Sequence, residues 1–264
     1  MMILELHDVY RRFGGLEALR RVNMAIEKNT VVGLIGPNGA GKTTLINNIS
    51  GLDHPSSGRI TFQNQSIENM APHRIARMGI ARTYQNIHLF KEFTTYENIL
   101  IGQHSRGKTS YLETLFFTPR FRKEERIYRE NTEALLERFQ LTEVAHTPAS
   151  SLAYGDQRRL EMARALALNP QLILLDEPTA GMNPMETRSL GEQIIKLKEE
   201  GLTILVIEHD MSLIHQVCDQ VYVLSFGEMI AHGPPDEIRQ NSAVIEAYLG
   251  RDEANTAPIK RIRV

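Results

Sequence analysis

The chain has 264 residues, 42% of them hydrophobic and 23% charged. Its length excludes a mini-protein, and its composition excludes global disorder. Thirty Lys and Arg residues against thirty-two Asp and Glu residues give a net charge of -2, so the basic excess that favours nucleic acid is missing and no nucleic-acid partner is expected. The one cysteine, Cys218, cannot form an internal disulfide.

The sequence also lacks the signals of a membrane-spanning or secreted protein. No apolar run approaches the roughly 20 residues that cross a bilayer, and the start, Met-Met-Ile-Leu-Glu, has no basic segment. We therefore expect a cytoplasmic protein that could still dock onto a membrane partner.

The first fifty residues indicate strands followed by a helix. Residues 3–6 alternate weakly between apolar and polar side chains and residues 22–26 alternate cleanly, with Gly14-Gly15 as a turn between them. Residues 31–35, Val-Val-Gly-Leu-Ile, form a continuous apolar run, which predicts a strand buried on both faces. A helix is expected over residues 42–49.

The middle of the chain, residues 86–164, is rich in helix formers. A helix is expected to begin near Thr94 or Thr95, either of which could be its N-cap. Residues 106–122 contain Gly, Ser and Pro and resemble a loop-rich insertion. Residues 123–139 predict a charged helix, whose charges indicate a solvated face rather than a binding patch.

The strand signal then returns. Residues 172–175, 203–207 and 221–224 are short apolar runs separated by helical stretches. This pattern predicts a mostly parallel sheet covered on both faces. The tail after Arg251 is polar and basic; it is expected to be mobile, with a membrane-surface role as the alternative.

A phosphate-binding loop follows the strand at 31–35. Residues 36–43 read Gly-Pro-Asn-Gly-Ala-Gly-Lys-Thr and match G-x-x-x-x-G-K-[ST] at every fixed position. Glycines let backbone N–H groups turn toward phosphate oxygens, and the helix N-terminus adds its dipole. Lys42 is expected to contact the β- and γ-phosphates rather than the core, and the Thr43 hydroxyl to bind Mg²⁺. A phosphate loop alone does not distinguish a kinase, a GTPase or an ATPase, so a nucleoside triphosphate and Mg²⁺ are expected here.

Two adjacent acids end the strand at 172–175. Asp176 is placed to hold Mg²⁺, and Glu177 is placed to orient or deprotonate a water that attacks the γ-phosphate. The alternative makes Asp176 a helix N-cap and Glu177 a solvated neighbour. A phosphate loop upstream favours the catalytic interpretation.

Together these motifs resemble the nucleotide-binding subunit of an ATP-binding-cassette (ABC) transporter over nearly the whole chain. The resemblance implies that Phe13 stacks on adenine, with Tyr10 as the alternative and core packing possible for both. It makes Gln85, in Ala-Arg-Thr-Tyr-Gln, a sensor and Mg²⁺ ligand where the two lobes join. It makes His209 a γ-phosphate switch, although a histidine after a strand is often a plain polar cap. It places Asn183 where the family usually has an aspartate.

The family signature, Leu-Ser-Gly-Gly-Gln, is changed here. Residues 152–156 read Leu-Ala-Tyr-Gly-Asp, so Ala153 replaces the serine whose hydroxyl donates to the ATP of the partner subunit. Gly155 is retained, and the backbone N–H groups near it and the N-terminus of the following helix can still donate. The resemblance therefore implies an ATP-bound dimer that depends on backbone donors more than usual.

The variant signature points to one subgroup. Leu-Ala-Tyr-Gly with Gln-Arg-Arg-Leu-Glu, and residues 177–184, Glu-Pro-Thr-Ala-Gly-Met-Asn-Pro, resemble the larger ATPase subunit of bacterial branched-chain amino-acid importers. The loop-rich segment over residues 103–130 fits the same subgroup. A lipopolysaccharide-type exporter ATPase is one alternative, although it would more often keep the serine. A non-transport ABC ATPase of translation or DNA repair is another, but the chain has one cassette and no sustained heptads.

The resemblance implies an α/β P-loop NTPase fold with a mostly parallel core sheet, an N-terminal antiparallel β part and an inserted helical subdomain. One ABC ATPase domain spans residues 1–250, with the core at about 1–85 and 165–235 and the helical subdomain at about 86–164; residues 251–264 form the tail. The implied partners are two membrane permeases, a second ATPase subunit in a homo- or heterodimer and, indirectly, a periplasmic solute-binding protein. The implied location is the cytoplasmic side of the inner membrane. Residues 87–90 are the candidate docking surface, with ordinary core packing as the alternative.

The expected site residues fall into three groups. The catalytic group is Gln85, Glu177 and His209, and the Mg²⁺ ligands are Thr43, Gln85 and Asp176. The ATP contacts are Phe13, Gly36, Pro37, Asn38, Gly39, Ala40, Gly41, Lys42, Thr43, Thr44, Ala153 and Gly155.

Overall fold

The computed structural model describes residues 1–104 and 118–255. The chain divides into two compact units: the first contains residues 1–69 and 206–264, and the second contains residues 70–205. The expected division into a core and a helical subdomain has other boundaries and stays a prediction. Most of the loop-rich segment expected at 106–122, and the end of the tail, lie outside the described residues.

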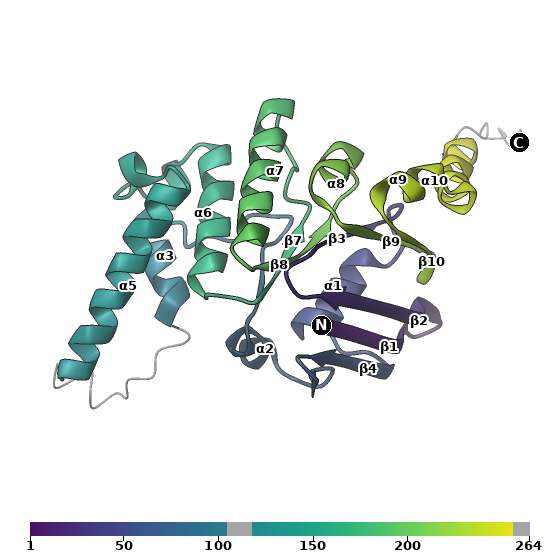
Figure 1. Ribbon diagram of the computed structural model, residues 1–264, viewed down its shortest axis with the longest axis horizontal. Coiled ribbons are helices and arrows are strands. Elements are labelled where there is room, and N and C mark those ends of the chain that lie inside the picture. The colour runs from purple at the N-terminus through teal and green to yellow at the C-terminus, as the bar shows by residue number, and fades with distance from the viewer. Residues whose placement is uncertain (105–117, 256–264) are drawn as a thin grey trace, which may run out of the picture. The chain divides into compact units, whose positions relative to one another are not determined.

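The N-terminal part of the first unit is an antiparallel sheet in the order β2-β1-β4-β5, and Figure 1 labels β2, β1 and β4. Its strands are β1 (Met2–Phe13), β2 (Leu16–Glu27), β4 (Ser57–Phe62) and β5 (Gln65–Ser66). Both predicted strands are confirmed, and Val22, Met24 and Ile26 are buried as the alternation requires. The strands are longer than expected because β1 and β2 continue through register shifts, one of them between Leu6 and Val9, which local periodicity does not show.

The first unit also holds one part of the core sheet, in the order β10-β9-β3. Strand β3 pairs in parallel with β9, and β9 pairs antiparallel with β10. All five residues of β3 are buried, as the apolar run predicted. The elements are β3 (Val31–Ile35), β9 (Gln220–Ser225), β10 (Glu228–Gly233), α1 (Lys42–Ser50), α8 (Met211–Val217), α9 (Pro235–Gln240) and α10 (Ser242–Asn255).

Cys218 provides a test of the packing behind β3. A Cβ placed on Gly33 would lie 3.1 Å from the Cys218 sulfur, so the thiol packs against the strand, and burial raises its pKa to about 12. Thiolate is the reactive form, so alkylation of this single cysteine by iodoacetamide at pH 8 should be about 10³-fold slower in the native protein than in urea, one power of ten for each unit of pKa. Equal rates in both conditions would contradict this packing.

The second unit contributes the order β8-β7-β6, with β6 and β7 parallel. The last two residues of β8 are counted with the first unit. The elements of the second unit are β6 (Ile80–Arg82), β7 (Leu172–Asp176), β8 (Thr203–Ile207), α2 (Pro72–Met78), α3 (Thr95–His104), α5 (Pro119–Arg138), α6 (Tyr154–Ala167), α7 (Pro184–Glu199) and the 3₁₀ turns Thr142–Val144 and Ala149–Ser151.

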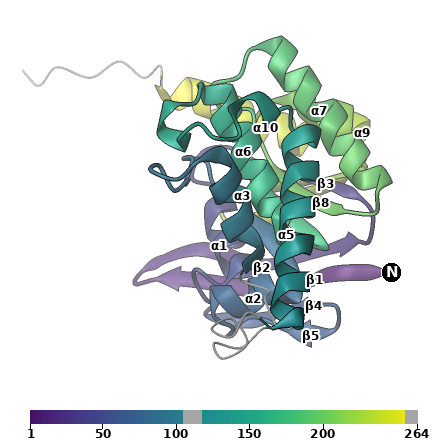
Figure 2. The ribbon, with the colours of Figure 1, turned by 90° about the vertical axis from the view of Figure 1, so that its left-hand side faces the viewer.

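Helices α3, α5 and α6 pack against one another, and Figure 2 shows them side by side. Thr94 is the N-cap of α3: its hydroxyl accepts from the Glu97 amide, and the Glu97 carboxylate accepts from the Thr94 amide. Helix α5 begins at Pro119, inside the segment expected to be a loop, because Thr118 caps it and proline suits its first position. Among the described residues, no helix is both long and apolar enough to span a membrane.

Candidate nucleotide site

The phosphate loop connects β3 to α1 through positions that only glycine can fill. A Cβ on Gly36 would lie 2.0 Å from the Leu224 carbonyl oxygen, and one on Gly41 would lie 2.6 Å from that of Ala18. Gly41 also has a φ of 109°, which side-chain-bearing residues rarely adopt. The backbone thus folds tightly at the start of α1, where N–H groups are available to an anion.

Lys42 is folded back over this loop. It is only 8% exposed, and its Nζ donates to the carbonyl oxygens of Gly36 at 2.6 Å and Pro37 at 3.2 Å. These acceptors are neutral, so the two bonds hold the ammonium at the loop without neutralising its charge. Thr43, the next residue, is exposed. The two hydrogen bonds tie the start of α1 to the loop, and the role of Lys42 toward phosphates stays a prediction.

Two further predicted residues of the first unit are exposed. Phe13 ends β1 and is 47% exposed, so core packing is excluded for it; the Arg11 guanidinium lies 4.3 Å from its ring centroid. The His209 side chain is 65% exposed, with Nδ1 3.6 Å from the buried carboxylate of Glu208. Asp210 caps α8 by accepting from the Ser212 amide, so His209 is not the N-cap of that helix.

In the second unit, β7 ends with the two predicted acids. Asp176 is 6% exposed, and its carboxylate accepts from Nη2 of Arg82, on the neighbouring strand β6, at 2.8 Å. Glu177 leaves the strand with a φ of 47°, and its Oε2 accepts from Nε2 of Gln85 at 2.6 Å. The structure thus brings together Gln85 and Glu177, two of the three residues predicted to be catalytic.

Asn183, and not Asp176, caps the helix that follows β7. The N-cap of α7 is Asn183, whose side chain accepts from the amides of Met185 and Glu186, while the Glu186 carboxylate accepts from the Asn183 amide. This capping box gives the asparagine a local role that needs no charge. The alternative interpretation of Asp176 as an N-cap is therefore wrong.

The signature segment forms the start of α6. Ala153 is exposed and is the N-cap, with no side-chain hydrogen bond to the helix. A Cβ on Gly155 would come no closer than 3.7 Å to the atoms around it, its nearest neighbour being Oε1 of Glu186. The packing of this chain therefore does not require glycine at position 155. A ligand that approaches the backbone closely would require it.

Ala153→Ser tests the start of this helix. A serine N-cap would satisfy one of the first amides of α6, so we expect the free energy of unfolding to rise by about 0.5–2 kcal/mol. The gain should appear in thermal melting of the chain without ATP. If the serine also reaches the ATP of a partner subunit, the ATP-dependent dimer in a Glu177→Gln background should tighten by a further ~1 kcal/mol, measured by analytical ultracentrifugation. An unchanged or weaker dimer would contradict the usual signature geometry.

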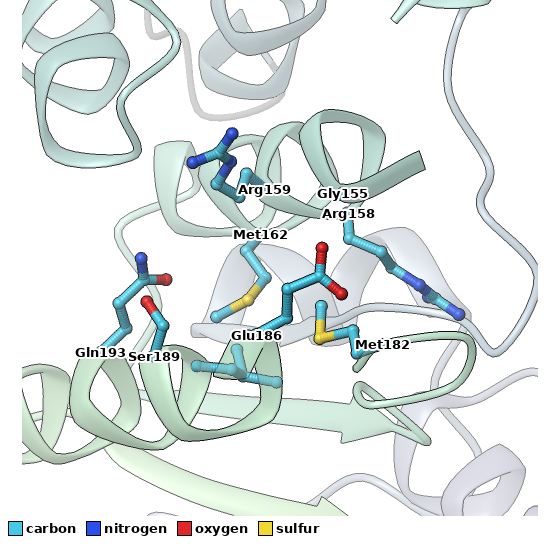
Figure 3. Close-up of a pocket in the computed structure, with 9 residues that line it drawn as sticks. Gly155, Arg158, Arg159, Met162, Met182, Glu186, Ser189 and Gln193 are labelled. Atoms are coloured by element: carbon cyan, nitrogen blue, oxygen red, sulfur yellow. The ribbon is translucent and has the colours of Figure 1, made fainter. Parts of the chain in front are cut away.

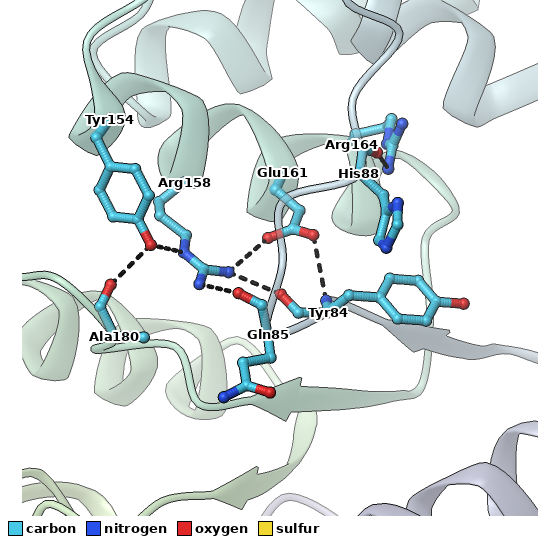
Figure 4. A network of polar contacts seen from close by, with 8 residues as sticks. All are labelled: Tyr84, Gln85, His88, Tyr154, Arg158, Glu161, Arg164 and Ala180. Carbon is cyan, nitrogen blue, oxygen red and sulfur yellow. Dashed lines mark hydrogen bonds and ion pairs between the residues drawn. The ribbon is translucent and has the colours of Figure 1, made fainter.

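A polar network joins α6 to two loops, and sequence reasoning did not find it (Figure 4). The Tyr154 hydroxyl donates to the Ala180 carbonyl at 2.8 Å and accepts from Nε of Arg158 at 3.3 Å. The Arg158 guanidinium also donates to the carbonyls of Tyr84 and Gln85 and to the Glu161 carboxylate. Burial raises the pKa of Glu161, although its bonds from the Tyr84 amide and Arg158 oppose the shift.

The residues predicted to bind a cation, Thr43, Gln85 and Asp176, offer oxygen atoms, which are the ligands that Mg²⁺ prefers. Within the described ranges no three His, Cys, Asp or Glu residues form a metal cluster. Mg²⁺ usually binds one or two protein oxygens together with phosphates and waters. The Thr43 hydroxyl and the Asp176 carboxylate are each oxygen donors of this kind. The amide nitrogen of Gln85 donates to Glu177, so its amide oxygen is the atom it could offer. The donor chemistry fits the ion.

Comparisons with known proteins decide the family. The family model described as "ABC transporter" matches residues 19–180, and the one described as "Branched-chain amino acid ATP-binding cassette transporter" matches residues 228–254. The high-affinity branched-chain amino acid transport ATP-binding protein BraF of Pseudomonas aeruginosa is 47% identical over 94% of this chain and 98% of its own. The chain belongs to the ATP-binding proteins of this ABC transporter family.

Two further matches agree with this. The Escherichia coli protein LivG, a high-affinity branched-chain amino acid transport ATP-binding protein, is 45% identical over 94% of this chain and 98% of its own. A crystal structure of a nucleotide-free ATP-binding cassette superimposes with a TM-score of 0.82 at 35% identity and covers 94% of this chain and 99% of its own. The predicted family, fold class and ATPase activity are confirmed, and the cassette binds ATP.

Proposed function

We propose that this cassette hydrolyses ATP to power the import of branched-chain amino acids through partner permeases. The observation that carries the proposal is the identity of 47% along nearly the full length of a curated branched-chain amino-acid transport protein. The second family model supports it, because its match at residues 228–254 lies outside the general ABC match.

The phosphate loop would bind the triphosphate. Backbone N–H groups within residues 36–44, of which Pro37 has none, would donate hydrogen bonds to the phosphates, and the Lys42 ammonium would offset the charge of the β- and γ-phosphates. Donors held in place before the reaction need little reorganisation. Phe13, with an exposed ring at the end of β1, would stack on adenine. Ala153 and Gly155 would contribute backbone contacts at the start of α6 to the ATP of a second subunit.

The acids would carry the chemistry. Glu177 would accept the proton of the attacking water, and Gln85 would hold its carboxylate through the 2.6 Å bond. His209, with its side chain in solvent, would contact the γ-phosphate. Thr43, Gln85 and Asp176 would hold Mg²⁺, which offsets the charge that develops on the phosphate oxygens. Arg82 would release or share Asp176 when the ion binds, because both contact the same carboxylate.

The chain would be part of an ABC transporter complex. In that complex it would work with two permeases, a second ATPase subunit and, indirectly, a periplasmic binding protein. We place it on the cytoplasmic side of the membrane, where ATP is available. Residues 87–90 would dock on a permease; Phe90 is 48% exposed, which supports an external contact.

Substrate-stimulated hydrolysis tests this function. The full-length chain is assembled with its permeases in nanodiscs, and ATP hydrolysis is measured with binding protein loaded with leucine, isoleucine or valine. We expect several-fold stimulation over unloaded binding protein and over protein incubated with lysine or glutamate. Stimulation by another solute class alone would contradict the proposed substrate and leave the ATPase assignment intact.

A further inference from the structure

The first turns of α6 contact the two loops that carry Gln85 and Glu177. Arg158 donates to the backbone carbonyls of Tyr84 and Gln85, while Tyr154 donates to Ala180. Ala180 lies three residues after Glu177, and its amide donates to the Glu177 carbonyl at 3.2 Å. Two neighbouring side chains of one helix thus hold both loops.

Burial makes the position of Arg158 well defined. Arg158 is 3% exposed and Glu161 is 2% exposed. A buried charge is strongly destabilising unless it is paired and hydrogen-bonded, and this guanidinium has acceptors on Tyr84, Gln85, Glu161 and Tyr154. Because Arg158 has little freedom to move, the carbonyls it contacts are held in place, and the backbone of Gln85 is fixed with them.

Tyr154 fixes the other loop. Its hydroxyl holds the Ala180 carbonyl, and a Cβ on Gly181 would lie 3.1 Å from its ring. The side chain therefore packs on the turn that begins at Glu177. Gln85 donates to the Glu177 carboxylate, and Tyr154 contacts the turn that carries the Glu177 backbone. Both loops that position this carboxylate therefore contact α6.

A cavity of about 150 Å³ lies between α6 and α7, next to these contacts (Figure 3). Gly155, Met162, Met182, Glu186 and Leu190 are among the residues that line it. The hydrogen bond from the Tyr154 hydroxyl to the Ala180 carbonyl joins α6 to the loop that continues to Met182. Arg158 joins α6 to the loop of Gln85.

We propose that Tyr154 and Arg158 are positioning residues for ATP hydrolysis, which set the backbone of the Gln85 loop and of the turn after Glu177 so that the Gln85 amide meets the Glu177 carboxylate. This inference rests on the proposed roles of Gln85 and Glu177. The tyrosine that replaces the usual signature glycine thereby has a function within its own chain.

Tyr154→Phe is the direct test, because it removes one hydroxyl and keeps the ring that packs on Gly181. In the full-length chain assembled with its permeases, we expect kcat for ATP hydrolysis to fall at least about fivefold, the effect of losing the neutral hydrogen bond to Ala180 alone; the bond from Arg158 is lost with it. KM for ATP should stay within about twofold, since the hydroxyl contacts Ala180 and Arg158, neither of which is proposed to bind ATP. Tyr128→Phe is the control: it removes a hydroxyl that donates to Glu124 within α5 and should leave kcat unchanged.

A double-mutant cycle separates positioning from general damage. In single-turnover hydrolysis, Tyr154→Phe should add almost nothing to the defect of Glu177→Gln, because residues that act through one group are not additive. Additive defects, or an unchanged kcat in Tyr154→Phe, would overturn the positioning role while leaving the proposed function intact. If Glu177→Gln hydrolyses ATP at the wild-type rate, the proposed role of Glu177 fails, and the positioning role fails with it.

Discussion

Glu177→Gln is expected to bind ATP and to hydrolyse it roughly 10²–10⁴-fold more slowly, the usual cost of losing a general base. Glutamine is nearly the same size as glutamate but cannot take a proton from water. The variant should accumulate in an ATP-bound dimer, visible by analytical ultracentrifugation, because hydrolysis no longer separates the subunits.

The contact with Gln85 indicates that Glu177→Gln should keep the local geometry of the site. Nε2 of Gln85 donates to Glu177, and an amide at position 177 can still accept through its oxygen, so the local geometry should survive. Glu199→Gln is a matched control, because Glu199 is an exposed acid at the end of α7; it should hydrolyse ATP normally. A Glu177→Gln variant with nearly wild-type turnover would refute the assignment of the base.

Lys42→Ala is expected to weaken ATP binding by roughly 10–100-fold, because charge-assisted hydrogen bonds contribute about 1.5–3 kcal/mol each. The bonds from Lys42 to Gly36 and Pro37 add a second effect. Their loss should lower the melting temperature by a few degrees, at about 2–4 °C for each kcal/mol in a chain of this size.

Lys28→Ala is the control for this substitution, since Lys28 is an exposed lysine near the end of β2. It should change neither ATP affinity nor melting. Affinity can be measured by fluorescence with a nucleotide analogue in both variants. Unchanged ATP affinity in Lys42→Ala would contradict the role of Lys42 in phosphate binding. Complete unfolding of the variant would indicate that the main role of Lys42 is structural.

Local sequence patterns were sufficient for the parts of the fold whose signal lies within a few residues. The apolar run of β3 followed by the glycine-rich loop and α1 is one case, and the run of β7 ending in Asp176 and Glu177 is another. Each depends on a buried strand that delivers polar groups at its carboxyl end. The roles assigned to those groups remain predictions that the experiments above would test.

Contacts between distant segments could not be predicted in this way. Arg82 meets Asp176 across 94 positions and Arg158 meets Tyr84 across 74, and no periodicity connects such pairs. One signal was available: Arg158 and Glu161 stand three apart on one face of a predicted helix, a spacing at which opposite charges pair. Their burial, which makes the pair important, depends on the tertiary packing of α6.

Uptake into proteoliposomes tests the central claim, that ATP hydrolysis at this site powers amino-acid import. The transporter is reconstituted with ATP on the side of this chain and leucine-loaded binding protein on the other, and labelled leucine inside is counted. We expect accumulation with the wild-type chain and with Glu199→Gln, and none above background with Glu177→Gln, although that variant still binds ATP. Accumulation at the wild-type rate with Glu177→Gln, or none with the wild-type chain in an intact assembly, would contradict the account.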